Sequence, residues 1–304
     1  MTTATLPPSR TGDAPPQVML RPIEHRDAGE AARIVCEAFA GIHDHHRFAR
    51  DFPTVEAAAQ LVEGFIDHPQ IWGVVAEADG RIIGSNFLDE RGPVLGVGPI
   101  TVDPVTQSAG VGRRLMEAVL ERGRSARGVR LLQDSFNTAS LSLYASLGFD
   151  PRDPIALLSG PVNAPVPPGI QVRPAHRDDL TACAALSHRV HGYERTNELA
   201  DAIDSPALSP FVAIDDGRVT AYATTLTFFP AAHAVAESDE SMRALIAGAA
   251  AATGAPAAFL LPVRQAELFR WCLAAGLRVV KPMTYMTVGE YSEPRGSWIP
   301  SVLY

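Results

Sequence analysis

Two glycines stand at the start of a predicted helix, where the backbone could bind an anion. An apolar, β-branched run ends at Val102, and a short loop then leads to Gly110 and Gly112. The first turn of a helix has unpaired N–H groups and a partial positive charge, and glycine lets a phosphate approach closely. Arg113 and Arg114 add charge at the same end. The stretch predicts an anion site, although an ordinary strand–turn–helix shaped by its glycines stays an alternative.

Two common nucleotide motifs do not fit this stretch. A P-loop needs Gly-Lys-Ser/Thr, whereas Arg113 follows Gly112. A dinucleotide fingerprint needs a third glycine where Leu115 stands, and its first glycine belongs at the end of the strand. Asp134 lies at a suitable sequence distance for a ribose contact, but these departures make a dinucleotide site the weaker interpretation.

A second segment repeats the pattern of buried strand followed by helix. Residues 129–133 read as a buried strand, and Asn137 occupies a helix N-cap position. Ser140 and Tyr144 follow along the helix, which ends at Gly148-Phe149. In its order and spacing, the chain resembles the GNAT superfamily of acyl-CoA-dependent N-acetyltransferases, on Val102-Asp-Pro, Gln107-x-x-Gly110-x-Gly112 and Asn137-x-x-Ser140-x-x-Leu143-Tyr144-x-x-x-Gly148-Phe149. The resemblance covers residues 18 to about 160 well and the rest faintly.

This resemblance implies a binding site for acetyl-CoA. The diphosphate would be bound by main-chain N–H groups of Gln107, Ser108, Ala109, Gly110, Val111, Gly112 and Arg113. The pantetheine arm would pair with the strand at Ile100, Thr101 and Val102, and the next helix would contribute Asn137, Ser140 and Tyr144. Main-chain N–H groups between Gly98 and Ile100 could stabilise charge on the thioester carbonyl, a role worth about 3–4 kcal/mol per well-placed donor.

Tyr144 is the candidate general acid by the same resemblance. A phenol with a pKa near 10 can protonate a thiolate leaving group. On helical periodicity alone, a core aromatic is the simpler interpretation, and the motif position favours the acid. Asn137 could likewise be a plain N-cap, which is compatible with a contact to the cofactor.

The general base is less determined by the sequence. The family often places an acid on the strand before the glycine loop, but residues 94–102 contain none. Asp89 and Glu90, at the end of the preceding strand, are the expected catalytic carboxylates, with Asp134 as a further candidate. His43, His45 and His46 fall in a predicted loop after a helix ending near Ala40; solvated surface is the simpler interpretation, and no metal site is expected.

The strand over residues 94–102 has an unusual composition. Gly96, Gly98 and Pro99 interrupt a strand that should be central, and proline removes a ladder hydrogen bond. A bulge, or a splaying of this strand from its neighbour, explains the pattern. In the resembled family such a splay opens the slot for the pantetheine arm. An edge strand with a tolerated proline is the alternative.

Around these motifs, hydrophobic periodicity predicts a mixed α/β (α+β) fold. Strands are expected over 17–23, 71–78, 81–88, 94–102, 129–133 and 155–159, with helices after Asp27, Thr54, Gly110 and Asn137. Asp79-Gly80 predicts a type I′ hairpin turn.

The resemblance implies two tandem GNAT-like domains, each a mixed, mostly antiparallel twisted sheet flanked by helices. The expected segments are a disordered tail (1–16), the catalytic domain (17–160), a Pro-rich linker (161–169), a degenerate second domain (170–288) and a C-terminal tail (289–304). The second half weakly repeats the first: the stretch Arg173 to Asp178 echoes Arg21 to Asp27. Residues 234–247 lack the glycine loop and carry acidic residues, so this copy is not expected to hold the cofactor. The tail is expected to dock on a domain or a partner.

Composition also narrows the partners. A net charge of −8 argues against nucleic acid or an anionic membrane surface, and no segment is long and apolar enough to span a membrane. Three scattered cysteines without disulfide or metal spacing favour a cytoplasmic location. Lys281 is the only lysine among 26 basic residues, which we interpret as compositional bias.

The sequence therefore predicts an N-acetyltransferase that transfers an acetyl group from acetyl-CoA to the amine of a small-molecule acceptor, directly in a ternary complex. A homodimer is an open expectation. The alternatives are a protein acetyltransferase, acting on a lysine or an N-terminal amine, and a non-catalytic acyl-CoA-binding module.

Overall fold

The structure, a computed structural model, describes residues 18–106 and 110–303. The predicted tail 1–16 and the predicted ligands Gln107, Ser108 and Ala109 lie outside the described residues. Within the described part of the chain, no helix combines the length and the apolar character needed to cross a membrane.

The first half alternates strands and helices in the expected order. Its elements are β1 (Met19–Pro22), α1 (Ala28–His46), α2 (Val55–Asp67), β2 (Ile71–Ala78), β3 (Arg81–Asp89), β4 (Val94–Val97), β5 (Thr101–Val102), α3 (Val111–Arg122), β6 (Gly128–Asp134), α4 (Thr138–Ser146) and β7 (Asp150–Gly160).

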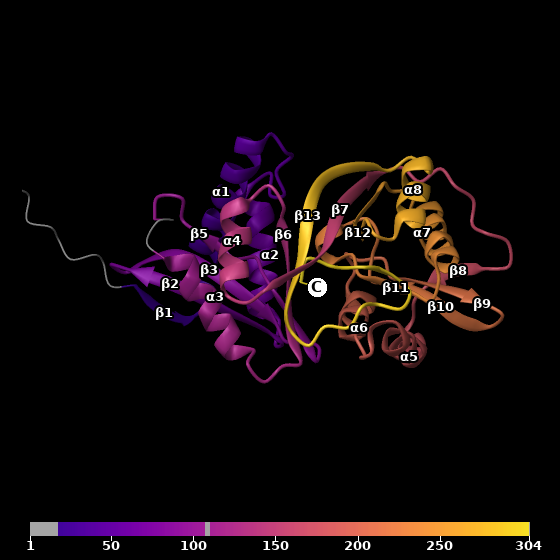
Figure 1. Ribbon diagram of the computed structural model, residues 1–304, viewed down its shortest axis with the longest axis horizontal. Coiled ribbons are helices and arrows are strands. Elements are labelled where there is room, and N and C mark those ends of the chain that lie inside the picture. Colours follow the sequence, from indigo (N-terminus) through magenta and orange to yellow (C-terminus); the bar gives the residue numbers. More distant parts are fainter. Residues whose placement is uncertain (1–17, 107–109, 304) are drawn as a thin grey trace, which may run out of the picture.

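The second half has a similar order. Its elements are β8 (Gln171–Pro174), α5 (Leu180–His191), α6 (Asn197–Asp204), β9 (Phe211–Asp215), β10 (Arg218–Ala223), β11 (Ala234–Ala236), α7 (Asp239–Thr253), β12 (Ala257–Pro262), α8 (Ala266–Ala274), β13 (Arg278–Gly289) and β14 (Ser297–Ile299). The fold class is the predicted one, with twisted and mostly antiparallel sheets flanked by helices (Figure 1).

Strands of the two halves pair with each other in one continuous sheet. The order of this sheet is β1-β2-β3-β4-β6-β13-β7-β12, with β5 paired to β3. β13 thus lies between β6 and β7 of the first half, and β7 lies between β13 and β12 of the second half (Figure 1). The boundaries 17–160 and 170–288 stay predictions, because hydrogen-bonded ladders cross them.

The predicted strand 94–102 is two strands that part from a neighbour. β4 pairs with β3 on one side and with β6 in parallel on the other, where Val97 meets Leu131. β5 pairs with β3 alone in the described chain, through Thr101 with Ser85 and Val102 with Gly84. The splay predicted from Gly98 and Pro99 is therefore present. The glycine at position 96 is explained by packing instead, because a Cβ there would lie 1.7 Å from the Leu303 carbonyl oxygen of the C-terminal tail.

Helices cover both faces of the first-half strands. α1 and α2 pack with Phe87 on one face, and α3 packs with Leu88, its neighbour in sequence, on the other. The two halves meet in a separate apolar cluster that joins Val94 to Met283 and Trp298. This shared core fixes β13 against the first half.

The predicted hairpin turn and two predicted helix caps are present in the structure. Asp79 and Gly80 both have positive φ, as a type I′ turn requires, and Thr54 and Asn137 each cap a helix by accepting a main-chain N–H. The predicted end of the first helix was wrong. α1 continues through Gly41 to His46, so the three histidines lie in its last turns rather than in a loop.

The internal repeat is confirmed with a shift of one residue. Arg21 pairs with Asp27 through both terminal nitrogens, at 2.6 and 2.8 Å, and Arg173 pairs in the same way with Asp179, at 2.8 and 2.7 Å. Asp179, not Asp178, is therefore the counterpart of Asp27. The C-terminal tail docks as expected: β14 pairs with β11, and Trp298 is buried.

Candidate active site

Among the described residues, no strand pairs with the edge of β5 that faces away from β3, which we call the slot. The Asp103 N–H donates to the Ile83 carbonyl at 2.9 Å, so alternate residues of this strand face β3. The main-chain N–H and carbonyl groups of Ile100 and Val102 consequently point to the opposite edge, where β6 has diverged. An extended ligand carrying amide groups could continue the sheet along this edge. The predicted ligands Ile100 and Val102 are thus placed for main-chain contacts, whereas Thr101 faces β3.

The N-terminus of α3 adjoins this edge. Gly110 is its N-cap with φ of +72°, a conformation that favours glycine. A Cβ on Gly112 would meet only Leu143 and Val102 at ordinary distances of 3.6 and 3.7 Å, so packing within the chain does not require a glycine there. The first N–H groups of a helix have no acceptor within the helix, so the N-terminus of α3, at Val111, Gly112 and Arg113, could bind a diphosphate.

The two arginines at this end already have partners within the chain. Arg113 donates to the Ser146 hydroxyl at 2.6 Å, and Arg114 donates to the Val18 carbonyl at 2.8 Å. Both guanidinium groups are partly exposed and keep their charge close to the helix end. The pattern in the sequence identified the charge but not these anchors.

The predicted residues Asn137, Ser140 and Tyr144 lie at the N-cap of α4 and at two positions further along the helix, about one turn apart. Asn137 accepts the Ser140 N–H at 3.2 Å, and Tyr144 lies one turn further on, buried against Phe149. Burial raises the pKa of Tyr144 to about 12, the nearby Asp134 carboxylate adds to this, and Ser140 opposes it. The phenol therefore keeps its proton at neutral pH, as a general acid requires.

Asp89 and Glu90 are both engaged by arginines. The Arg91 Nε atom lies 3.0 Å from both Asp89 oxygens, and a terminal nitrogen of the same arginine lies 2.9 Å from Asp201 of the second half. Glu90 accepts two hydrogen bonds from Arg122, at 2.8 and 2.9 Å. Their assignment as catalytic carboxylates stays a prediction.

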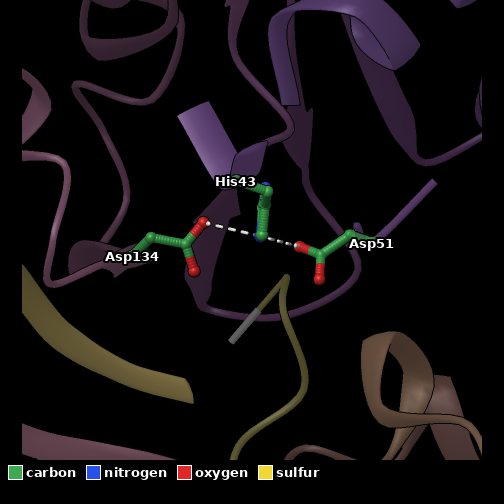
Figure 2. A group of neighbouring side chains, drawn as sticks. All are labelled: His43, Asp51 and Asp134. Atoms are coloured by element: carbon green, nitrogen blue, oxygen red, sulfur yellow. Dashed lines mark ion pairs between the residues drawn. The ribbon is translucent and has the colours of Figure 1, made fainter. Parts of the chain in front are cut away.

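A buried polar cluster lies at the end of β6, where the sheet opens. His43 of α1, Asp51 of the following loop and Asp134 of β6 point toward one another (Figure 2). The His43 Nε2 atom lies 3.5 Å from Asp134 and 3.6 Å from Asp51. Its Nδ1 lies 2.7 Å from the Phe39 carbonyl; because a carbonyl only accepts, Nδ1 carries the proton and Nε2 is an acceptor.

Lys281 of β13 completes this cluster from the second half. Its ammonium lies 2.6 Å from Asp51 Oδ2, 2.7 Å from Asp134 Oδ1 and 3.2 Å from His43 Nε2, and the side chain is 1% exposed. Burial raises the pKa of Asp134, and the Lys281 charge opposes this rise. The group His43, Asp51, Asp134 and Lys281 is called the Lys281 cluster below.

The three ligand atoms of His43, Asp51 and Asp134 lie within 4.8 Å of one another, a spacing also found at metal sites. Here the Lys281 ammonium lies among them and supplies the positive charge. We therefore assign no metal to the cluster.

The second half has no comparable slot in the part of the chain that the structure describes. β14 pairs along the outer edge of β11, through Ala234 with Ile299 and Ala236 with Ser297. At the start of α7, Asp239 accepts a hydrogen bond from the Ser297 hydroxyl, so a carboxylate lies where a phosphate would bind. The degenerate copy thus has a structural cause. In the second half, β14 of the tail covers the edge of β11, whereas in the first half the edge of β5 is left open.

These features define a class of protein, a tandem α/β fold with one splayed sheet beside a helix N-terminus. Residues 34–149 match the sequence profile of the Acetyltransferase (GNAT) family. Over this segment the chain is similar to members of that family.

Two curated relatives are both named mycothiol acetyltransferase. One, from Nocardia farcinica, is 38% identical over 41% of this chain and 42% of its own length. The other, from Clavibacter michiganensis, is 27% identical over 66% of this chain and 72% of its own length. The first match thus spans less than half of that relative.

Solved structures agree on the fold of the whole chain. A candidate acetyltransferase from Pyrococcus horikoshii aligns over 95% of this chain and 96% of its own, with a TM-score of 0.71 and 15% identity. A tandem GNAT protein of the clavulanic acid biosynthesis pathway aligns over 91% of this chain and 100% of its own, with a TM-score of 0.57 and 11% identity. At these identities the likeness shows the fold alone.

Sequence reasoning missed the most deeply buried part of the site. Asp51 carried no motif, and Lys281 lay in the half expected to be inactive. One signal could have found it: a chain that uses arginine for 25 of its 26 basic residues keeps one lysine.

Proposed function

We propose that the chain is an N-acetyltransferase that uses acetyl-CoA and acts on the amine of a small-molecule acceptor, by direct transfer in a ternary complex. The open edge of β5 beside the N-terminus of α3 carries this proposal. When bound there, acetyl-CoA supplies the acetyl thioester. Ile100 and Val102 would hold the pantetheine arm through main-chain groups, and the amides of Gly110 to Arg113 would hold the diphosphate, with Gln107, Ser108 and Ala109 as further ligands expected from the sequence.

Tyr144 would donate its proton to the leaving sulfur. Its burial and raised pKa support a group that is protonated before each turnover. Asn137 and Ser140, at the start of the same helix, would order this end of the site and contact the cofactor. The edge filled by β14 supports a single acyl-CoA site per chain.

The name of the two relatives favours a small-molecule acceptor over a protein acceptor. Mycothiol therefore belongs in the acceptor panel alongside amines and amino acids. A non-catalytic acyl-CoA-binding module would bind acetyl-CoA without releasing the thiol in the presence of any acceptor.

The test has two parts on the full chain. Calorimetry with acetyl-CoA should give one site per chain, and acceptor-dependent release of coenzyme A thiol should follow in a panel of amines, amino acids and mycothiol. No binding of acetyl-CoA would contradict the proposal. Binding of acetyl-CoA without transfer to any small molecule of the panel, but with transfer to a protein lysine or N-terminus, would favour the protein acetyltransferase.

A further inference from the structure

The ammonium of Lys281 hydrogen-bonds to Asp51 and His43 and forms an ion pair with Asp134. A lysine ammonium has three donors, and here three acceptors surround it: Asp51 Oδ2, Asp134 Oδ1 and His43 Nε2. The Phe229 ring lies 5.8 Å away and closes the side toward the second half. The rings of Phe136 and Phe48 stack at 4.4 Å, and Phe136 also meets the His43 ring, so aromatic groups surround the cluster.

The choice of lysine at this position follows from the geometry. Arginine presents a planar fork of five donors, which suits one carboxylate in a bidentate pair. Three acceptors converging on one point suit a compact ammonium instead. A chain with 25 arginines thus carries its only lysine where three acceptors converge.

The charges of the cluster do not cancel. Two carboxylates and one ammonium leave a formal charge of −1, with His43 neutral because its Nε2 accepts from Lys281. A buried site with one uncompensated negative charge can take up a proton. The Asp134 charge contributes to the raised pKa of Tyr144, so these two side chains interact electrostatically.

We propose that Asp134 accepts the proton of the incoming ammonium group, and that Lys281, supplied by the second half, is the positioning residue that holds Asp134 for this task. The inference rests on the proposed function and deepens it by naming the base. It also gives the second half a role, because the base of the first half is positioned by a side chain from β13.

Two residues, Asp134 and Tyr144, move the protons of the reaction. Asp134 takes one proton from the acceptor ammonium, which frees the nitrogen lone pair to form the N–C bond while the C–S bond breaks. Tyr144 gives its hydroxyl proton to the departing sulfur, and the second amine proton restores the Tyr144 hydroxyl. Asp134 returns its proton to solvent, so both residues end as they began.

Groups from four elements face Asp134. They are His43 on α1, Asp51 on the loop after it, Tyr144 on α4 and Lys281 on β13. The Lys281 charge lowers the pKa of Asp134 and Asp51 raises it. Removing the Lys281 charge should move the acidic limb of kcat/KM to higher pH by about 1–3 units, the range for a close opposite charge.

Because Lys281 is the only lysine, its state can be read directly in the full chain. Incorporation of lysine labelled with ¹⁵N at Nζ and ¹³C at Cε should give one side-chain signal. In Asp134→Asn and in Asp51→Asn this signal should shift, whereas Asp67→Asn, an exposed carboxylate at the end of α2, should leave it unchanged. An unshifted signal in Asp134→Asn would overturn the assigned cluster.

Kinetics then test the role of Asp134. Asp134→Asn should lower kcat by about 10²–10⁴-fold and abolish the acidic limb, with acetyl-CoA affinity unchanged. Lys281→Met should shift that limb, and Lys281→Arg, which keeps the charge, should shift it less. Circular dichroism confirms folding for each variant, and Asp134→Asn serves if Lys281→Met does not fold.

Different results would contradict the base assignment and the proposed acetyltransferase activity. Active Asp134→Asn enzyme with an intact acidic limb would overturn the base assignment while the acetyltransferase stands. An inactive wild-type chain that does not bind acetyl-CoA would instead overturn the proposed function, whatever the lysine signal does.

Discussion

The ammonium of Lys281 and the carboxylate of Asp134 lie 2.7 Å apart, although one belongs to β13 of the second half and the other to β6 of the first. This contact is possible because β13 pairs directly with β6, with Met283 opposite Asp134. The two halves therefore share a sheet, a core and a polar cluster. The second half thus contributes one side chain, Lys281, to a polar cluster whose other members belong to the first half.

Tyr144→Phe should lower kcat by about 10²–10⁴-fold, because it removes the proton that the leaving sulfur needs. Acetyl-CoA affinity should stay the same, since the ring and its packing against Phe149 remain. Steady-state kinetics with calorimetry measure both. Tyr291→Phe, whose ring lies against the Arg130 and Arg152 guanidinium groups, is the control. An unchanged kcat in Tyr144→Phe would show that the phenol is not the acid.

Gly112→Glu should abolish the thermal stabilisation that acetyl-CoA gives, because a carboxylate would fill and repel the diphosphate site. The matched control is Gly64→Glu on α2, where nothing lies within 4 Å of a Cβ. Differential scanning fluorimetry with and without acetyl-CoA compares the two. Equal stabilisation of both variants would mean that the diphosphate binds elsewhere.

Gly96→Ala should destabilise the protein, because its Cβ would lie 1.7 Å from the Leu303 carbonyl oxygen and the backbone of the tail must move. Overpacking of this kind costs typically about 1–3 kcal/mol. Gly92→Ala is the control, since its nearest contact is an ordinary 3.5 Å. Thermal unfolding of both variants measures the difference. Equal melting temperatures would contradict the close passage of the tail over β4.

Stability should fall as the pH drops from 7 to 5. Burial holds the pKa of His191 and of His233 well below the ordinary value of 6.5, so below that pH the unfolded state binds more protons than the folded state. His233 Nδ1 donates to the Ile299 carbonyl of β14, a bond that protonation would keep, so the expected loss of stability comes from burying the added charge. Melting temperatures across this range provide the measurement, and His233→Gln should flatten the dependence. A rise in stability on acidification would be the opposite result.

Local chemistry made much of this fold predictable. Asp79-Gly80 determines its turn by itself, Asn137 its helix cap, and Gly98-Pro99 the break between β4 and β5. These features depend on neighbours in sequence. The continuation of α1 past Gly41 was missed because tertiary packing of His43 outweighs the weak local preference of one glycine, about 1 kcal/mol.

Contacts distant in sequence could not be predicted in the same way. No local pattern says that β13 inserts between β6 and β7, or that Gly96 is small because Leu303 passes over it. The Lys281 cluster combines both difficulties, since its four residues come from four separate segments. The motifs pointed to the proposed cofactor residues, whereas the Lys281 cluster depends on β13 lying between β6 and β7.

The central claim is that the open edge of β5 and the N-terminus of α3 bind acetyl-CoA. A crystal structure of the full chain soaked with coenzyme A tests it most directly. The account predicts a diphosphate on the amides of Gly110 to Arg113 and a pantetheine arm along Ile100 and Val102. Density for the coenzyme beside β11 in the second half, or no density in the slot at a saturating concentration, would contradict it.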